Sequence, residues 1–234
     1  KVILSGFDLI QPGVNGVGQW QRHSGAIHKI QLTPDHGLSI GESSILIDGE
    51  IQKIARWPNA PSAFDFDWKR MASPESATHD TSSGAPEPPY EGTFFTASYN
   101  DLELPGSDPD FWKGARIDTS SGGGVFQNTG LVTASGPGSV TFRYRPFPAS
   151  SQFASESDPY FLWNHLNALD EEGEYFFDME GINGPPFMLY LWTPGGASPE
   201  TMQVEMKRRD YAFNFNWVSD VSVRNITFYG AGDE

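Results

Sequence analysis

The sequence has no cysteine, so the 234-residue chain contains neither a disulfide bridge nor a thiolate metal site. It also has no apolar run that approaches the ~20 residues of a membrane-spanning helix. Basic residues are few, because 15 Lys and Arg stand against 30 Asp and Glu, which gives a net charge of −15. A nucleic-acid partner needs Lys and Arg to neutralise its phosphates. We therefore expect neither nucleic acid nor membrane as a partner.

Charged residues are also scarce, whereas aromatic residues and turn formers are abundant. Charged residues make up 19% of the chain, aromatic residues 14%, and there are 25 Gly and 18 Pro. This combination is typical of all-β proteins, in which many short strands are joined by turns. The predicted fold class is all-β, a β-sandwich of antiparallel strands that forms a single domain over 1–234.

The clearest local signal is the segment 44–57, SILIDGEIQKIARW. Asp48-Gly49 separates two arms rich in β-branched residues, and Asp-Gly suits the positive φ angles of a type I′ turn. The sequence therefore predicts a β-hairpin here. By their alternation or short apolar runs, further strands are expected at 2–4, 26–32, 94–99, 125–127, 130–134, 140–144, 174–179, 187–193, 203–207, 211–215 and 221–228.

Two segments differ from this strand pattern. Phe161, Leu162, Leu166 and Leu169 fit one helical face, so the spacing predicts a helix over 161–170. Pro, Ser, Ala and Asp dominate 58–89, and its end, DTSSGAPEPP, is typical of an exposed loop. A loop of this length is usually functional or mobile.

Several phrases occur in a recognisable order: VILSGFD, LIDGEIQKIARWPN, DFWKGARI, LDEEGEYFFD, LYLWTP and RDYAFNFNWVSDVSVRNITFYGA. The succession resembles the region of secreted right-handed parallel β-helix carbohydrate-active enzymes in which a β-sandwich interrupts the β-helix. The β-xylosidases of glycoside hydrolase family 120 show this architecture. The matched positions are Asp48, Gly49, Gln52, Ala55, Arg56, Trp57, Pro58 and Asn59, then Leu169, Asp170, Gly173, Glu174 and Asp178. The family's Trp-Tyr pair is replaced by Tyr175 and Phe176.

The resemblance implies that the strands in 1–10 and 211–234 are β-helix rungs around a sandwich, and that the protein is secreted. In the resembled enzymes the catalytic carboxylates lie on later rungs, which have no counterpart before Glu234. No catalytic residue is therefore expected, and this chain alone is not expected to be an enzyme. The implied function is a non-catalytic carbohydrate-binding module. The alternatives are part of a β-helix glycoside hydrolase or polysaccharide lyase, or a structural insertion.

Sugar binding requires an aromatic ring beside polar groups, because a sugar presents a C–H face and hydroxyl edges. Trp68, in the phrase FDFDWKR, is the first candidate, with Asp67 and Arg70 as its polar neighbours. The alternative is that Trp68 packs its loop onto the sandwich. Trp20, which follows the Gly-rich stretch QPGVNGVG, and Trp192, in LYLWTP, are the other candidates.

No cofactor is expected. The five His residues have no metal-ligand spacing. The acidic clusters Asp108/Asp110 and 170–172 are either structural calcium ligands or solvated turn residues. The expected partner is a polysaccharide or oligosaccharide that binds to a monomer. The net charge of −15 favours a neutral or weakly charged chain, such as agarose or xylan, over a polyanion.

Overall fold

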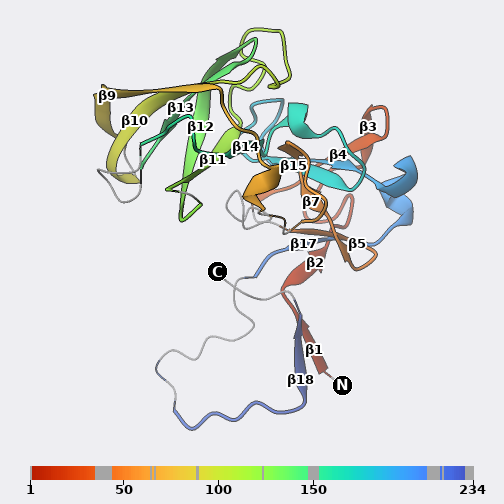
Figure 1. Ribbon diagram of the computed structural model, residues 1–234. Coiled ribbons are helices and arrows are strands. Elements are labelled where there is room, and N and C mark those ends of the chain that lie inside the picture. Colours follow the sequence, from red (N-terminus) through yellow and green to blue (C-terminus); the bar gives the residue numbers. More distant parts are fainter. Residues whose placement is uncertain are drawn as a thin grey trace. The chain divides into compact units, whose positions relative to one another are not determined.

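Strands make up nearly all the regular structure of the protein (Figure 1). The computed structural model describes residues 2–34, 44–63, 65, 67–87, 90–122, 124–146, 153–209, 217 and 219–229. The chain divides into two compact units, a first unit of Lys1–Lys53 with Glu172–Glu234 and a second unit of Ile54–Glu171. None of the helices found in these ranges is long and apolar enough to cross a membrane. The all-β prediction is confirmed.

The second unit contains an antiparallel sheet of seven strands in the order β8-β14-β11-β12-β13-β10-β9. Its strands are β8 (Arg56–Trp57), β9 (Ser76–Glu87), β10 (Tyr90–Asn100), β11 (Arg116–Ser121), β12 (Phe126–Gly136), β13 (Ser139–Tyr144) and β14 (Tyr160–Trp163). Two short 3-10 helices belong to the same unit, η2 (Trp68–Arg70) and η3 (Leu166–Ala168). Because successive residues of β13 alternate between half-exposed and buried, one face of the sheet forms the core.

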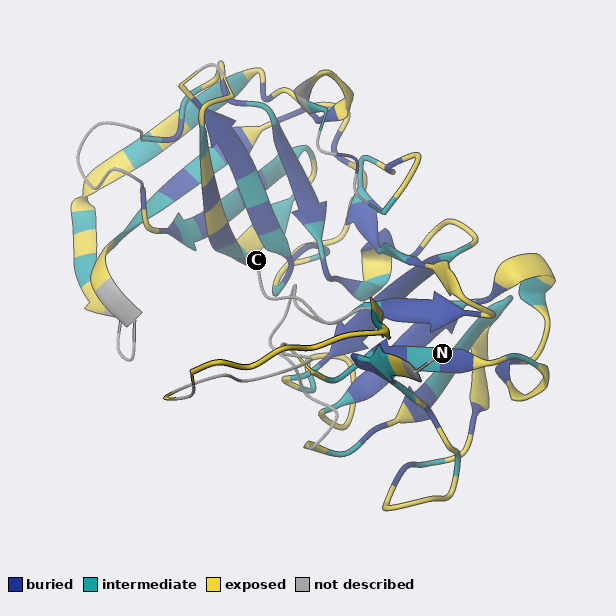
Figure 2. Ribbon diagram, turned by 90° about the horizontal axis from the view of Figure 1, so that it is seen from below, coloured by how far each residue is buried: buried dark blue, intermediate teal, exposed yellow. Residues whose placement is uncertain are grey.

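Tyrosines occupy the centre of this core. Tyr99, Tyr144 and Tyr160 are fully buried, and Figure 2 shows the buried positions in dark blue along the strands. Tyr160 donates its hydroxyl hydrogen bond to Asp101 Oδ2 over 2.9 Å. Burial raises the pKa of Tyr99 and Tyr160, and it raises the pKa of Tyr144 to about 12. Much of the aromatic content of the chain therefore serves packing.

The first unit contains three smaller sheets. The five-stranded sheet, in the order β3-β4-β16-β15-β7, consists of β3 (Gln21–Ser24), β4 (Ile27–Gln31), β7 (Lys53–Ile54), β15 (Glu174–Asp178) and β16 (Met188–Trp192). The four-stranded sheet, in the order β2-β17-β5-β6, consists of β2 (Phe7–Leu9), β5 (Ile45–Ile47), β6 (Glu50–Ile51) and β17 (Val204–Lys207). The remaining elements are the strand pair β1 (Val2–Ser5) and β18 (Ile226–Tyr229), with η4 (Pro194–Gly196) and η5 (Pro199–Thr201).

The predicted hairpin at Asp48-Gly49 is confirmed. Strands β5 and β6 pair in antiparallel register, with Ile47 opposite Glu50. The φ angles of Asp48 and Gly49 are 51° and 85°, as a type I′ turn requires. The carboxylate of Asp48 also accepts a hydrogen bond from the Gln203 backbone over 2.8 Å, which ties the turn to the residue before β17.

The predicted helix over 161–170 is wrong. Strand β14 occupies its first residues and the single turn η3 lies within the remainder. Tyr160, Phe161 and Leu162 are all buried, because both faces of this strand are covered. A strand buried on both faces reads as a continuous apolar run, which periodicity alone does not distinguish from a helix.

The predicted loop over 80–89 is also wrong as far as Glu87, because β9 continues to that residue. Among the described strands, β9 lies at the edge of the seven-stranded sheet and pairs with β10. Most of its side chains in 80–86 are exposed or half-exposed, so they need no apolar alternation. The last two residues of the predicted loop lie outside the described ranges.

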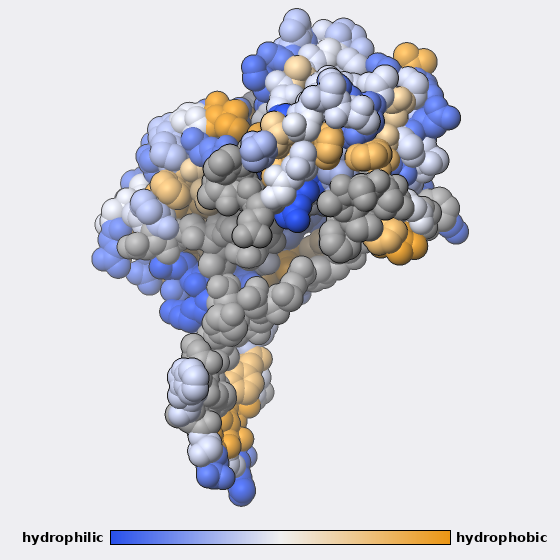
Figure 3. Space-filling view, turned by 90° about the vertical axis from the view of Figure 1, so that its left-hand side faces the viewer, coloured by the Kyte–Doolittle hydropathy of each residue, from blue (hydrophilic) through white to orange (hydrophobic). Residues whose placement is uncertain are grey.

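The two outermost strands, β1 and β18, pair in parallel, with Val2 opposite Ile226 and Ser5 opposite Tyr229. Figure 3 shows apolar side chains gathered over this pair at the bottom of the view, and Ile3 and Phe228 are 58% and 48% exposed. Parallel pairing is the arrangement that rungs would have, but these strands do not show a right-handed β-helix. The predicted strand 211–215 lies outside the described residues. Compactness does not test whether 1–234 folds as one domain, so this stays a prediction.

Candidate functional site

Two adjoining hollows lie on the first unit, and residues of the loop 11–18 between β2 and β3 line both of them. One has a volume of about 600 Å³ and the other about 410 Å³. Both values fall within the range of roughly 300–1,000 Å³ that is usual for ligand sites. Leu9, Gln11 and Val14 line both hollows, so the two share a wall.

The loop that forms this wall is fixed by backbone geometry. Gly13 N–H donates to Val17 O over 3.0 Å, and Gly18 N–H donates to Gln31 O over 2.7 Å. Gly13 and Gly16 have φ angles of 75° and 83°, which glycine adopts without steric cost. The glycines of QPGVNGVG thus allow a tight loop that is closed by its own backbone hydrogen bonds.

The smaller hollow is mainly apolar, and we call it the Trp20 hollow. Trp20 retains 9% of its surface, so its indole forms part of the lining and not a projecting platform. The remaining residues around this hollow are Ile10, Pro12, Pro199, Glu200, Met202 and Val204. Apolar surface beside the amide of Gln11 and the carboxylate of Glu200 matches the C–H face and the hydroxyl edge of a sugar ring.

The larger hollow is polar, and we call it the Arg208 hollow. Its further lining residues are Asp8, Asn15, Val17, Thr33 and Arg208. Arg209 donates two hydrogen bonds to the Asp8 carboxylate, over 2.7 and 3.1 Å. The guanidinium of Arg208 lies 3.9 Å from Asp8 Oδ2, which is beyond hydrogen-bonding distance. Asp8, which lines this hollow with Arg208, therefore lies close to two guanidinium groups.

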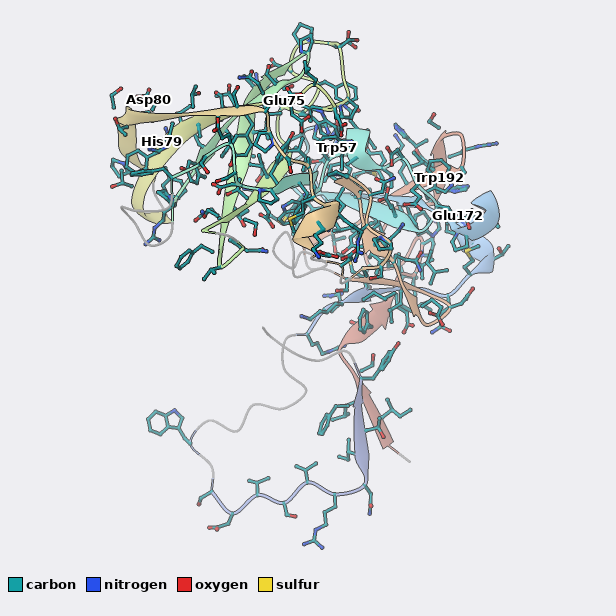
Figure 4. The ribbon with its side chains drawn as sticks, in the orientation of Figure 1. Trp57, Glu75, His79, Asp80, Glu172 and Trp192 are labelled. Atoms are coloured by element: carbon teal, nitrogen blue, oxygen red, sulfur yellow. The ribbon has the colours of Figure 1, made fainter. Side chains whose placement is uncertain are left out.

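Of the residues predicted from the sequence, Trp20 is the one that the structure places in these hollows. Trp192 is half-buried in β16, where it pairs with Ile27 of β4, and it lines neither hollow (Figure 4). The residues missed were Asp8, Val14 and Arg208. The glycines of 11–18 were the available signal, but they indicated only a loop.

The other predicted group, around η2, forms a local ion cluster in the second unit. Arg70 donates to both oxygens of Asp65, over 2.6 and 2.7 Å, and approaches Asp67 to 3.2 Å. The hydrogen bond from Arg70 and one from the Asp67 backbone lower the pKa of Asp65 to about 2. The side chain of Trp68 lies outside the described part of the structure, so a sugar platform at this residue stays a prediction.

The acidic clusters have local partners. Asp110 forms an ion pair with Lys113 at 3.3 Å, and Asp170 accepts a hydrogen bond from the Asn59 amide over 2.9 Å. The described residues contain no group of three His, Asp or Glu that could hold a metal ion. Asp110 and Asp170 thus have side-chain partners within the protein. Structural calcium at these clusters stays a prediction.

No protein-family model and no curated protein match the chain. A solved structure named "Glycoside hydrolase" superposes on 88% of it with a TM-score of 0.54 and 15% sequence identity. The match covers 32% of that protein, so this chain spans about a third of its length. The similarity is one of fold.

Proposed function

We propose that this chain is a non-catalytic carbohydrate-binding region that holds one polysaccharide chain across the Trp20 hollow and the Arg208 hollow. The observation that carries the proposal is their shared wall of Leu9, Gln11 and Val14. A shared wall lets one extended ligand place an apolar ring face on one side and hydroxyl groups on the other. The fold likeness to a part of a glycoside hydrolase supports a carbohydrate over other ligands with the same surface chemistry.

The proposal also explains why binding needs little rearrangement. The 11–18 loop is closed by its own backbone hydrogen bonds, so its backbone needs no ligand to hold it. Preorganisation of this kind reduces the entropy cost of binding. Leu9 and Val14 are 45% and 43% exposed, which leaves apolar surface available on the wall.

Affinity electrophoresis of the whole chain in gels that contain xylan, agarose or β-glucan tests this proposal. We expect at least one neutral polysaccharide to retard the protein. Val14→Glu places a charge on the shared wall and should abolish the retardation. The matched control is Val125→Glu, because Val125 is 72% exposed and belongs to the second unit. No retardation by any polymer, or equal retardation of both variants, contradicts the proposal.

A second candidate function is that of a cleft-shaping part of a β-helix glycoside hydrolase or polysaccharide lyase, with catalytic residues outside this chain. The observation that favours it is the 32% coverage of the solved structure named "Glycoside hydrolase". The first candidate predicts binding without turnover. Reducing ends or unsaturated uronates that accumulate in proportion to the concentration of this chain would show that catalytic groups lie within it, and would contradict both candidates.

A further inference from the structure

Among the described residues, the charged groups at Asp8 have a balance opposite in sign to that of the whole chain. The chain carries −15, yet Asp8, which lines the Arg208 hollow, faces two arginines. Arg209 occupies both oxygens of Asp8, so this carboxylate is neutralised by a bidentate pair. Arg208 adds a second guanidinium charge beside that pair. The local balance of these three groups is one positive charge.

Resting on the proposed function, we propose that Arg208 binds an anionic group on a sugar, either a uronate carboxylate or a sulfate ester, within an otherwise neutral polysaccharide. Arginine presents a planar fork of N–H donors that matches the oxygens of such groups. The side chain of Arg208 is 26% exposed and lines the hollow, so part of it is accessible to a ligand.

A sparsely charged polymer fits better than a polyanion. The screening length is ~8 Å at physiological salt, so carboxylates of the protein repel anionic groups that come within about that distance. A densely charged polymer brings many of its charges that close to a chain whose net charge is −15. A single anionic group in contact with Arg208 is affected chiefly by the local excess of guanidinium. A neighbouring neutral ring then has the Trp20 hollow beside it, because the two hollows share a wall.

The test compares polymers that differ only in their anionic group. One arm uses glucuronoxylan and the same material after carboxyl reduction, and the other uses sparsely sulfated agar galactan and its desulfated form. We expect the whole chain to bind the anionic form of one pair about tenfold more tightly than its neutral form, which is the scale of a charge-assisted hydrogen bond. The arm that shows the preference identifies the anion as carboxylate or sulfate.

Arg208→Gln should remove this preference, so that the anionic and neutral forms of a polymer bind this variant with equal affinity. The matched control is Arg224→Gln, which alters the net charge equally. Arg224 is exposed, donates to Ser222 Oγ over 3.1 Å and lines neither hollow. Equal binding of both forms by the unmodified chain, or a preference that survives Arg208→Gln, overturns the inference. The proposed function still holds in that case if the chain binds the neutral forms. Absence of binding to every polymer overturns the proposed function itself.

Discussion

Two aspartate–arginine clusters, one in each unit, differ in their charge balance. In the second unit the Arg70 guanidinium pairs with the carboxylates of Asp65 and Asp67, and the Arg56 guanidinium donates to the Asp65 backbone carbonyl over 2.7 Å. In the first unit two guanidinium groups, Arg208 and Arg209, face the single carboxylate of Asp8. The charges of the second-unit cluster therefore balance, whereas the first-unit cluster has one positive charge in excess.

The difference shows that the local balance of charge at one cluster can depart from the net charge of −15. From the net charge alone, the sequence predicts a neutral or weakly charged ligand, and it indicates Arg70 and Asp67 as polar neighbours of a platform. The structure gives both of these side chains local partners. It leaves a cation in excess at Arg208, which the composition does not indicate.

The largest effect is expected from a change in the loop 11–18, which forms the wall of the Arg208 hollow. Gly13→Ala forces a side chain into a φ of 75° and places Cβ 2.6 Å from the Gln19 side chain. Thermal unfolding should show a loss of about 1–2 kcal/mol, and polysaccharide binding should weaken severalfold. Gly25→Ala is the control, because Gly25 has a φ of 55° with nothing within 4 Å of the new Cβ. It should show a similar loss of stability with unchanged affinity. Equal weakening of binding in both variants would refute a specific role of the loop.

A second variant removes the positive excess of the first-unit cluster. Arg209→Gln removes both hydrogen bonds to Asp8, so Arg208 becomes the partner of this carboxylate. The preference for the anionic polymer, measured by affinity electrophoresis, should fall about tenfold. Adding Asp8→Asn to the same protein should restore the preference, because no carboxylate then competes for Arg208. Failure of the double variant to recover would count against this account.

A smaller effect is expected from a variant that increases the positive charge of the first-unit cluster. Asp8→Asn alone leaves two guanidinium groups without their carboxylate. Binding of the anionic polymer should tighten about threefold at low salt, the scale of a partly exposed ion pair, and the gain should vanish at high salt. Isothermal titration at two salt concentrations measures both. A loss of affinity would mean that the Asp8 carboxylate itself contacts the ligand.

The smallest expected effect concerns the cluster of the second unit and appears only in acid. The pKa of Asp65 is lowered from 3.8 to about 2 in the folded protein, chiefly by the hydrogen bond from Arg70. Its contribution to stability is therefore complete above pH 4 and is lost as the pH falls towards 2. Asp65→Asn should flatten the fall in Tm over this range and leave polysaccharide binding at neutral pH unchanged. A Tm profile as steep as that of the unmodified chain would show that other carboxylates dominate.

Local rules of sequence predicted much of the fold. Asp48-Gly49 defines a hairpin because only a few residues adopt its φ angles, and the structure has it. The apolar run of β14 predicts a helix, because the sequence does not indicate that other elements cover both faces of this strand. Strand β9 was read partly as loop because an edge strand that is largely exposed needs no apolar alternation.

The candidate site was harder to predict, because its parts come from distant segments. Trp20 stood out locally beside a Gly-rich stretch. Asp8 and Arg208 are separated by nearly the whole chain, and they meet because β17 pairs with β2, with Met206 opposite Asp8. Neither side chain has a local pattern that distinguishes it from any other surface charge. Strand register, which no single segment encodes, creates the excess of positive charge.

The buried tyrosines of the second unit also provide an optical record of its unfolding. A tyrosinate absorbs at longer wavelength than the neutral phenol, and burial keeps Tyr99, Tyr144 and Tyr160 neutral at pH values at which an exposed phenol ionises. Their raised pKa values stabilise the folded unit below about pH 10, and this stabilisation is lost progressively as the pH rises further. Alkaline unfolding of the second unit should therefore appear as a cooperative step in absorbance, separate from the gradual titration of exposed tyrosines.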